Sequence, residues 1–236
     1  MTTGIRHISL ATTLLSWVSG YADTAGFLRL DGLFTAHVTG NLIIAGVEIA
    51  GTNGEAVWVR LAVILVFIAA VGLTTLITRT RRPRLSRLLW LETLCLLLFA
   101  VVGVLVLPNQ TTELLPLNMF MVGSAGVFAM GIQNALMRES LGTLAQTTVM
   151  TGNLTQLTID ATRKILIRDY RKVENSSAQE REIQQRLVKF GGAVVGFILG
   201  AAFGAFFMRI IGFWSILLPV LAVALLAFDT QQHETA

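Results

Sequence analysis

The sequence has little charge and one cysteine, and each shortage excludes classes of protein. Only 14% of its 236 residues are charged, whereas a soluble domain averages about 25%, which excludes a water-soluble enzyme, a nucleic-acid-binding module and a disordered chain. Cys95 lies alone in an apolar run, which excludes a disulfide framework and a cysteine metal site. We see no phosphate-binding glycine loop, no metal-ligand spacing and no nucleophile–base pair, so we expect neither catalysis nor a cofactor.

What the sequence has is apolar runs, because 54% of its residues are hydrophobic. A helix of about 20 apolar residues crosses a bilayer, and six stretches qualify: 8–28, 57–78, 87–107, 117–137, 190–209 and 211–228. Two further segments, 39–50 and 151–162, are too short, since 12 helical residues cover only about 18 Å. We interpret them as interfacial helices or as re-entrant half-helices that the other helices shield from lipid.

The two short segments share a sequence. His-Val-Thr-Gly-Asn-Leu at 37–42 matches Val-Met-Thr-Gly-Asn-Leu at 149–154. Asp23 precedes the first copy at nearly the spacing at which Asn134 precedes the second. Internal repeats of this kind are typical of transporters for small solutes.

Each half of the chain therefore has one long helix, one Thr-Gly-Asn segment and two more long helices. The first repeat covers 1–107, and the second covers 108–236 with a hydrophilic insertion at 163–188. We interpret this insertion as a loop or a short cytoplasmic helix.

The positions of the basic residues favour a topology. If neither Thr-Gly-Asn segment crosses, both termini and the basic loops at 79–87 and 163–189 lie on one side, with 15 of the 18 Lys and Arg residues. Basic loops remain cytoplasmic, so this arrangement is favoured over eight spans. With three spans in each half, the repeats are inverted. The sequence thus predicts an all-α membrane protein with six transmembrane helices, two re-entrant half-helices and two inverted-topology repeats.

The Thr-Gly-Asn segments are the candidate binding site. Thr is a good helix N-cap, and the free N–H groups of two helix starts that converge from opposite sides favour an anion or a neutral hydrogen-bonding solute. The alternative is that Thr and Asn only cap buried helix ends. The predicted substrate-binding residues are Thr39, Gly40, Asn41, Thr151, Gly152, Asn153, Asn134 and Gln133.

Asp23 is the predicted proton-coupling residue, because a carboxylate within a spanning helix is unfavourable and marks function by default. The alternative is a solvated carboxylate near the interface. His37 is interpreted as an ordinary hydrogen-bonded histidine, since its repeat position is Val149. We expect Glu92 to reach the cytoplasmic face and pair with a nearby arginine, and Glu48 to be solvated.

A glycine stripe recurs every four residues near the end of the chain. Such a stripe lets another helix approach closely, either within one chain or, as the alternative, across a homodimer. Its members are Gly192, Gly196, Gly200 and Gly204.

These motifs resemble a known family. Gly-Tyr-Ala-Asp at 20–23, His-Val-Thr-Gly-Asn at 37–41, Gly-Ile-Gln-Asn at 131–134 and Met-Thr-Gly-Asn at 150–153 look like the YoaK family of bacterial multi-pass membrane proteins, whose function is uncharacterised. The resemblance implies a bacterial inner-membrane location but supplies no substrate and no site residue.

Two functions fit this sequence. The first is a secondary transporter or channel for a small polar or anionic solute, proton-coupled through Asp23. The second is a non-transporting membrane sensor or scaffold that acts through its basic cytoplasmic loops. A polar cavity at the Thr-Gly-Asn segments would favour the first, and a filled midplane would favour the second.

Overall fold

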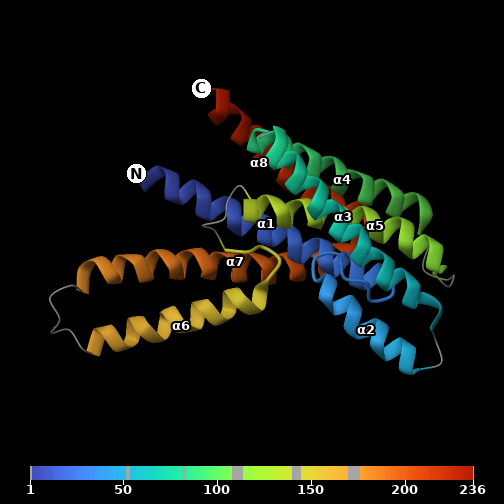
Figure 1. Cartoon of the computed structure of the whole chain (residues 1–236), viewed down its shortest axis with the longest axis horizontal. Helices are drawn as coiled ribbons and strands as arrows, with labels where there is room; N and C mark the ends of the chain where they lie inside the picture. Colours follow the sequence, from blue (N-terminus) through green and yellow to red (C-terminus); the bar gives the residue numbers. More distant parts are fainter. Residues whose placement is uncertain are drawn as a thin grey trace.

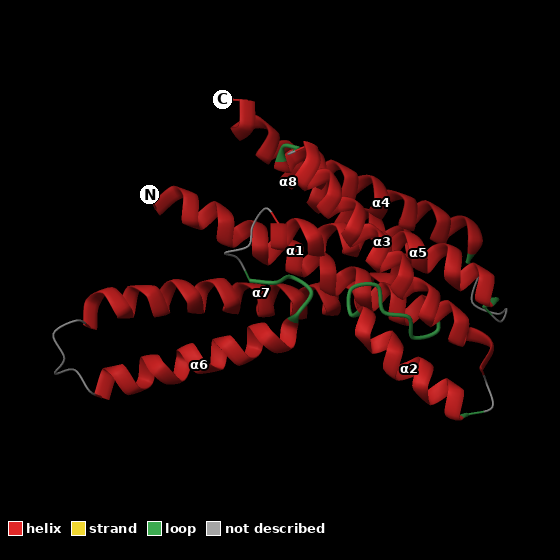
Figure 2. Cartoon of the chain, viewed as in Figure 1, coloured by secondary structure: helices red, strands yellow, loops and turns green. Residues whose placement is uncertain are grey.

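The computed structural model describes residues 2–51, 54–81, 83–107, 114–139, 145–169 and 176–235. In these ranges the regular structure is helical throughout (Figure 2). The elements are α1 (Thr2–Arg29), α2 (Val38–Ala50), η1 (Gly54–Ala56), α3 (Val57–Arg81), α4 (Leu85–Val106), α5 (Pro116–Glu139), α6 (Met150–Asp169), α7 (Ser176–Ile211), η2 (Gly212–Ile216) and α8 (Leu217–Thr235).

Long apolar helices dominate the described part of the chain. Four of its helical stretches are long and apolar enough to cross a bilayer: Gly54–Arg81, Leu85–Val106, Pro116–Glu139 and Glu180–Thr235. The last contains both α7 and α8. A helix satisfies its own backbone hydrogen bonds, which is why lipid selects it. These stretches confirm a helical protein suited to a membrane, whereas the exact count of six spans remains a prediction.

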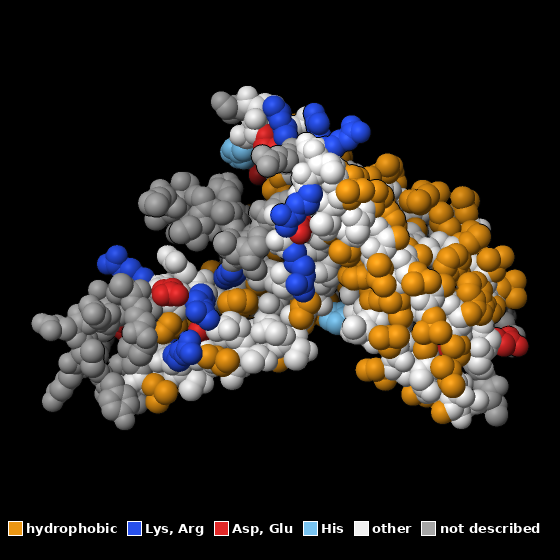
Figure 3. Space-filling view, in the orientation of Figure 1, with side chains coloured by type: hydrophobic (Ala, Val, Ile, Leu, Met, Phe, Trp, Pro, Cys, Tyr) orange, Lys and Arg blue, Asp and Glu red, His pale blue; other side chains and the backbone are white. Residues whose placement is uncertain are grey.

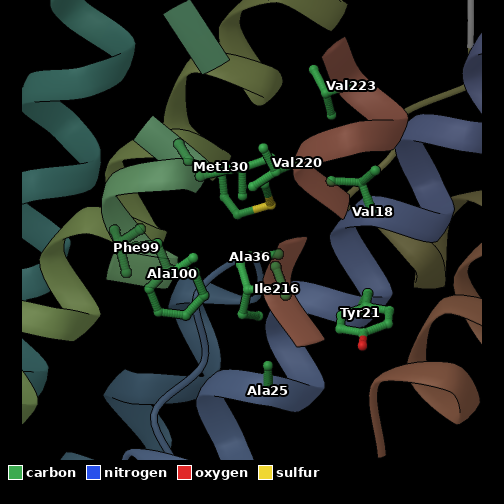
Figure 4. Close-up of a cluster of buried hydrophobic side chains, with 14 of the residues drawn as sticks. Val18, Tyr21, Ala25, Ala36, Phe99, Ala100, Met130, Ile216, Val220 and Val223 are labelled. Atoms are coloured by element: carbon green, nitrogen blue, oxygen red, sulfur yellow. The ribbon is translucent and has the colours of Figure 1, made fainter. Parts of the chain in front are cut away.

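The buried core lies between α1, α4, α5 and α8. Figure 4 shows Val18 of α1, Met130 of α5 and Val220 of α8 pointing toward one another, with Phe99 of α4 beside them. Each of these side chains is at most 7% exposed. Large apolar side chains cover the outside as well, including Leu65, Leu105 and Leu225, as expected of a surface that faces lipid.

Helix α1 packs along α7 through the glycine stripe. A Cβ atom at Gly196 or Gly200 would overlap the carbonyl oxygen of Thr13 or Trp17, and one at Gly204 would lie 2.9 Å from that of Tyr21. Only glycine permits so close an approach of two helices. The stripe is therefore used within the chain, and Gly196, Gly200 and Gly204 are not available as a homodimer seam.

The helix pairs repeat between the two halves. Helix α1 packs on α7 and α5 packs on α3, while α2 packs on α3 and α6 packs on α7. Helix α4 contacts α5 and α8, and α8 contacts α1. If α1, α2, α3 and α4 are exchanged with α5, α6, α7 and α8 in that order, each packed pair becomes a pair that also packs. For example, α1–α7 becomes α5–α3, and α4–α8 becomes itself. The list of packed helix pairs is thus unchanged by this exchange.

The chain termini, the helix ends and the connections between helices lie in two groups at opposite ends of the bundle. In Figure 1 both termini, the α3–α4 connection and the outer ends of α6 and α7 lie toward the left, whereas the outer end of α2 and the start of α5 lie toward the right. Lys and Arg side chains gather on the left and middle of the space-filling view, and hydrophobic side chains cover its right part (Figure 3). The segments predicted to be cytoplasmic therefore share one end.

The described parts of the hydrophilic insertion are helical, which agrees with the helix alternative and not with the loop. Helix α6 continues to Asp169, well past the expected end at residue 162, and α7 begins at Ser176. Asp160 has no exposed side-chain surface and accepts a hydrogen bond from Arg186 at 3.1 Å, which joins the two helices. At 1.5 Å per residue, the 36 residues of α7 span about 54 Å, so the α6–α7 hairpin extends beyond a bilayer core.

Two expectations for single acidic residues are wrong. Glu92 does not reach the surface: it is fully buried, and neither carboxylate oxygen has a hydrogen-bond partner among the described residues. Glu48 is not solvated, because its Oε1 accepts from Nε and a terminal nitrogen of Arg60, both at 2.8 Å. Arg60, 2% exposed, also donates to the carbonyl of Asp31 at 2.6 Å. Because Glu48 and Arg60 have little exposed surface, their side chains pair with each other instead of contacting solvent.

Candidate functional site

Two loops lie midway along the helix bundle. Residues 30–37 lead into α2 and residues 145–149 lead into α6, and both loops lie at mid-length, away from the ends of the bundle (Figure 2). The helices begin at Val38 and Met150, so Thr39 and Thr151 lie inside the first turn. The prediction that these threonines are N-caps is therefore wrong, and for α2 the N-cap position is His37.

Asp23 holds the first loop. Its Oδ1 accepts hydrogen bonds from the backbone N–H groups of Thr35 and Ala36 at 2.8 Å each and of His37 at 3.3 Å. Its Oδ2 lies 2.7 Å from Nδ1 of His37. The Asp23 side chain is only 5% exposed. A carboxylate surrounded by four donors satisfies the N–H groups of the loop that leads into α2, and it does so from another helix.

Asn41 and Asn153 hold their loops in the same way. Oδ1 of Asn41 accepts from the backbone N–H of Phe34 at 2.9 Å, and its Nδ2 donates to the Phe34 carbonyl at 2.8 Å. Nδ2 of Asn153 donates to the carbonyl of Gln146, again seven residues earlier. Both asparagines are buried. The repeated motif therefore has a repeated structural role, which is to fold the preceding loop back on the helix start.

The second loop is anchored by amides in place of a carboxylate. Asn134 donates from Nδ2 to Oγ1 of Thr148. Gln133 donates from Nε2 to Oγ1 of Thr147 at 2.7 Å and to the carbonyl of Leu15 at 2.9 Å. Amides suffice here because this loop offers hydroxyl groups, whereas the first loop offers backbone N–H groups.

A cavity of about 480 Å³ lies between the two loops. Both Thr-Gly-Asn helix starts form its wall, together with α3 and α5. The lining residues of α2 and its loop are Ala36, His37, Val38 and Thr39, and those of α6 and its loop are Thr148, Val149, Met150 and Thr151. Helix α5 adds Asn134, Ala135 and Arg138, and α3 adds Phe67 and Val71. The volume lies within the usual range for small-molecule sites.

The predicted site residues divide into two groups. Thr39, Thr151 and Asn134 are on the cavity wall. The remaining predicted residues are not among the described lining residues: Gly40, Asn41, Gly152, Asn153, Gln133 and Asp23. Gly40 instead makes room for the ring of Phe34, to which a Cβ would come within 2.8 Å. Of the second group, Asn41, Asn153, Gln133 and Asp23 hold the loops through hydrogen bonds.

His37 and Arg138 are site residues that the sequence reasoning did not select. His37 lies on the wall in a loop outside the spanning helices, with its side chain 33% exposed. The hydrogen bond to Asp23 raises the pKa of His37; burial opposes this, and the negative charge of Asp23 adds to the increase. Arg138 follows Asn134 by four residues on α5, and this helical spacing could have placed both on one face.

Comparison with known proteins decides the family. A family model described as "Protein of unknown function (DUF1275)" matches residues 11–228. The chain belongs to this family. It is similar to the UPF0700 transmembrane protein YoaK of Bacillus subtilis (strain 168), with 26% identity over 175 residues that cover 72% of this chain and 74% of the relative. No solved structure matches the chain significantly.

Membership in this family confirms the resemblance that the motifs indicated. The named relative is a transmembrane protein, and the four long apolar helical stretches agree with it. The chain is therefore an integral membrane protein. Neither the family description nor the relative's name states an activity, so the function has to be argued from the cavity.

Proposed function

We propose that this protein is a secondary transporter or channel for a small polar or anionic solute. The cavity between the two Thr-Gly-Asn helix starts carries this proposal. A site at mid-depth between repeated elements is the arrangement that solute carriers use, because rocking of one repeat against the other then exposes the site to each side in turn.

The packing supports the finer architecture of the proposal, in which six spans and two re-entrant half-helices form inverted repeats. Helix α2 has 13 residues, about 20 Å, which is too short to cross. In Figure 1, α2 and α6 start near each other in the middle and run toward opposite ends. The exchange of helix pairs between the halves is what an inverted repeat would produce. In this reading both termini lie on the cytoplasmic side of a bacterial inner membrane.

The site test blocks the cavity and measures solute flux into proteoliposomes. Thr39→Trp and Thr151→Trp add bulk to the wall, so flux should fall at least tenfold. Thr155→Trp is the matched control, since Thr155 lies one turn after Thr151 and is not among the described lining residues. Undiminished flux in both wall variants would contradict the proposal.

Replacing a loop-supporting asparagine should change stability, whereas the wall variants should change flux. Asn41→Ala removes two side-chain hydrogen bonds to the backbone of Phe34. We expect it to lower the melting temperature in detergent, with any loss of flux following from the displaced loop. A variant with unchanged melting temperature and abolished flux would assign Asn41 to direct solute contact instead.

The topology is tested by cysteine labelling. Replacing Cys95 by serine gives a cysteine-free chain, because it is the sole cysteine. Single cysteines at positions 83 and 176 should react with a membrane-impermeant reagent only from the cytoplasmic side. Labelling of either position from outside would contradict both the sidedness and the inverted repeat.

The projecting α6–α7 hairpin favours one alternative, a membrane sensor or scaffold. Its outer part carries Lys164 and Arg186, and the latter is held by Asp160 and Glu182. A scaffold would work with the cavity blocked, so the tryptophan variants separate the two functions. Neither reading includes a catalytic step.

A further inference from the structure

The described wall of the cavity carries two basic side chains and no acidic one. His37 and Arg138 are its ionisable members. Within the described residues, Arg138 has no carboxylate at ion-pair distance, because the adjacent Glu139 pairs with Arg79 at 2.8 Å. The first turns of α2 and α6 add the positive ends of two helix dipoles. Arg138 is exposed, and a guanidinium with no carboxylate partner among the described residues, beside two helix starts, attracts an anion.

The charge behind the wall depends on one proton. Asp23 lies next to His37 but is not among the described lining residues of the cavity, and its carboxylate accepts from three backbone N–H groups. With neutral His37, the Asp23–His37 pair carries one negative charge beside the site. When His37 is protonated, the charges of Asp23 and His37 cancel. The net charge of Asp23, His37 and Arg138 together is then the single positive charge of Arg138.

We infer that the cavity binds a small anion together with one proton, and that this proton is held on Nε2 of His37. The inference rests on the proposed transport function and specifies its substrate class and its coupling group. Nδ1 of His37 donates to Asp23 and fixes the ring, which leaves Nε2 to take up the second proton. Asp23 is then the positioning residue, in contrast to the coupling role that the sequence suggested.

The other groups that face His37 do not compete for the proton. From α7 the ring of Phe197 lies 5.2 Å from the imidazole, and from the loop the ring of Phe34 lies at 6.4 Å. Helix α3 contributes only apolar side chains to the wall, and the loop before α6 contributes Thr148. Asp23 and Arg138 are therefore the charged groups that act on the imidazole, one favouring and one opposing its protonation.

The test measures anion binding to the purified full-length protein in detergent at pH 5.5 and pH 8. Nitrate, acetate and phosphate are the probes, ionic strength is held constant with a bulky sulfonate, and binding is read from the rise in melting temperature. The affinity should be roughly 5–150-fold higher at pH 5.5, the usual range for coupling between two bound ligands. Urea and glycerol serve as neutral probes and should not bind.

Variants assign the two roles. In His37→Gln the affinity should be independent of pH and equal to that of the wild type at pH 8, because the side chain no longer ionises. Arg138→Gln should lose binding at both pH values. His233→Gln is the matched control, since His233 is a 70% exposed histidine on α8; it should retain the pH dependence. Retained pH dependence in His37→Gln would overturn the assignment.

A measurement on the wild type alone avoids dependence on variant folding. In weakly buffered solution at pH 8, saturation with the anion that binds should cause a net uptake of protons, because the bound anion favours protonated His37. No proton uptake, or no binding of any of the three anions at either pH, overturns the inference. The transport proposal fails separately, when the tryptophan variants at Thr39 and Thr151 leave flux unchanged.

Discussion

Replacing Asp23 tests whether one carboxylate of α1 holds the start of α2. In Asp23→Ala the backbone N–H groups of residues 35–37 lose their acceptor. Each unsatisfied buried donor is unfavourable by about 1–3 kcal/mol, and the adjoining cavity lets water relieve part of this, so we expect a loss of roughly 3–6 kcal/mol. For a chain of this size, about 2–4 °C per kcal/mol gives a fall in melting temperature of roughly 6–24 °C.

Asp23→Asn should fall between the wild type and Asp23→Ala. The amide keeps an oxygen that accepts from the loop, but the bonds lose their charge, and bonds to charged groups are about twice as strong as neutral ones. We therefore expect about half the loss. Hydrogen exchange of the amides of residues 35–37 reports the same event locally and should accelerate in the order wild type, Asn, Ala.

The control for this series is Asp229→Asn. Asp229 is 57% exposed on α8 and lies far along the chain from the loop. It should leave both the melting temperature and the exchange of residues 35–37 unchanged. An Asp23→Ala variant that melts within about 2 °C of the wild type, with normal exchange at these amides, would refute the anchoring argument.

Three further predictions concern packing, a buried ion pair and pH. Gly200→Ala should lower the melting temperature because its Cβ overlaps the α1 backbone, whereas Gly72→Ala, with nothing within 4 Å, should not; equal effects would contradict the close packing. Glu48→Gln removes the closer carboxylate of buried Arg60, leaving exposed Asp31 at 3.8 Å, and should destabilise by about 3 kcal/mol in a melting experiment, unlike the exposed Glu55→Gln. Because the pKa of His37 is raised in the folded protein, its contribution to stability is full below its ordinary value of 6.5 and is lost as pH rises through the folded value; the melting-temperature difference from His37→Gln should shrink over that window, and a constant difference would oppose this.

Sequence reasoning found the helices more reliably than the contacts. Each of the six predicted spanning stretches overlaps a long helix, because apolar length is a local property of the sequence. The start of α2 was placed within one residue, since the Thr-Gly-Asn motif marks it. The end of α6 was missed because its second half is polar, and its stability comes from packing on α7, with Asp160 bonded to Arg186.

The site was predicted only in part for a related reason. The repeat identified which two segments to bring together, and the structure places Thr39 and Thr151 on one cavity wall. It could not separate wall residues from supporting ones, because that depends on the direction of each side chain. His37 was set aside for lacking a symmetric partner, yet the asymmetry itself, a carboxylate and an imidazole in one half only, distinguishes the two loops.

The interlocked helix pairs have a consequence for the order of synthesis. Helix α1 leaves the ribosome first, but the glycine stripe that packs on its backbone belongs to α7, which is made more than 150 residues later. Until then α1, with the buried polar side chains Ser16 and Ser19, lacks its most extensive partner, although Asp23 can already bond the loop at residues 35–37. The packing of α1 is therefore completed only when α7 has been made. A ribosome that stops before α7 leaves α1 without its main packing surface, the glycine stripe.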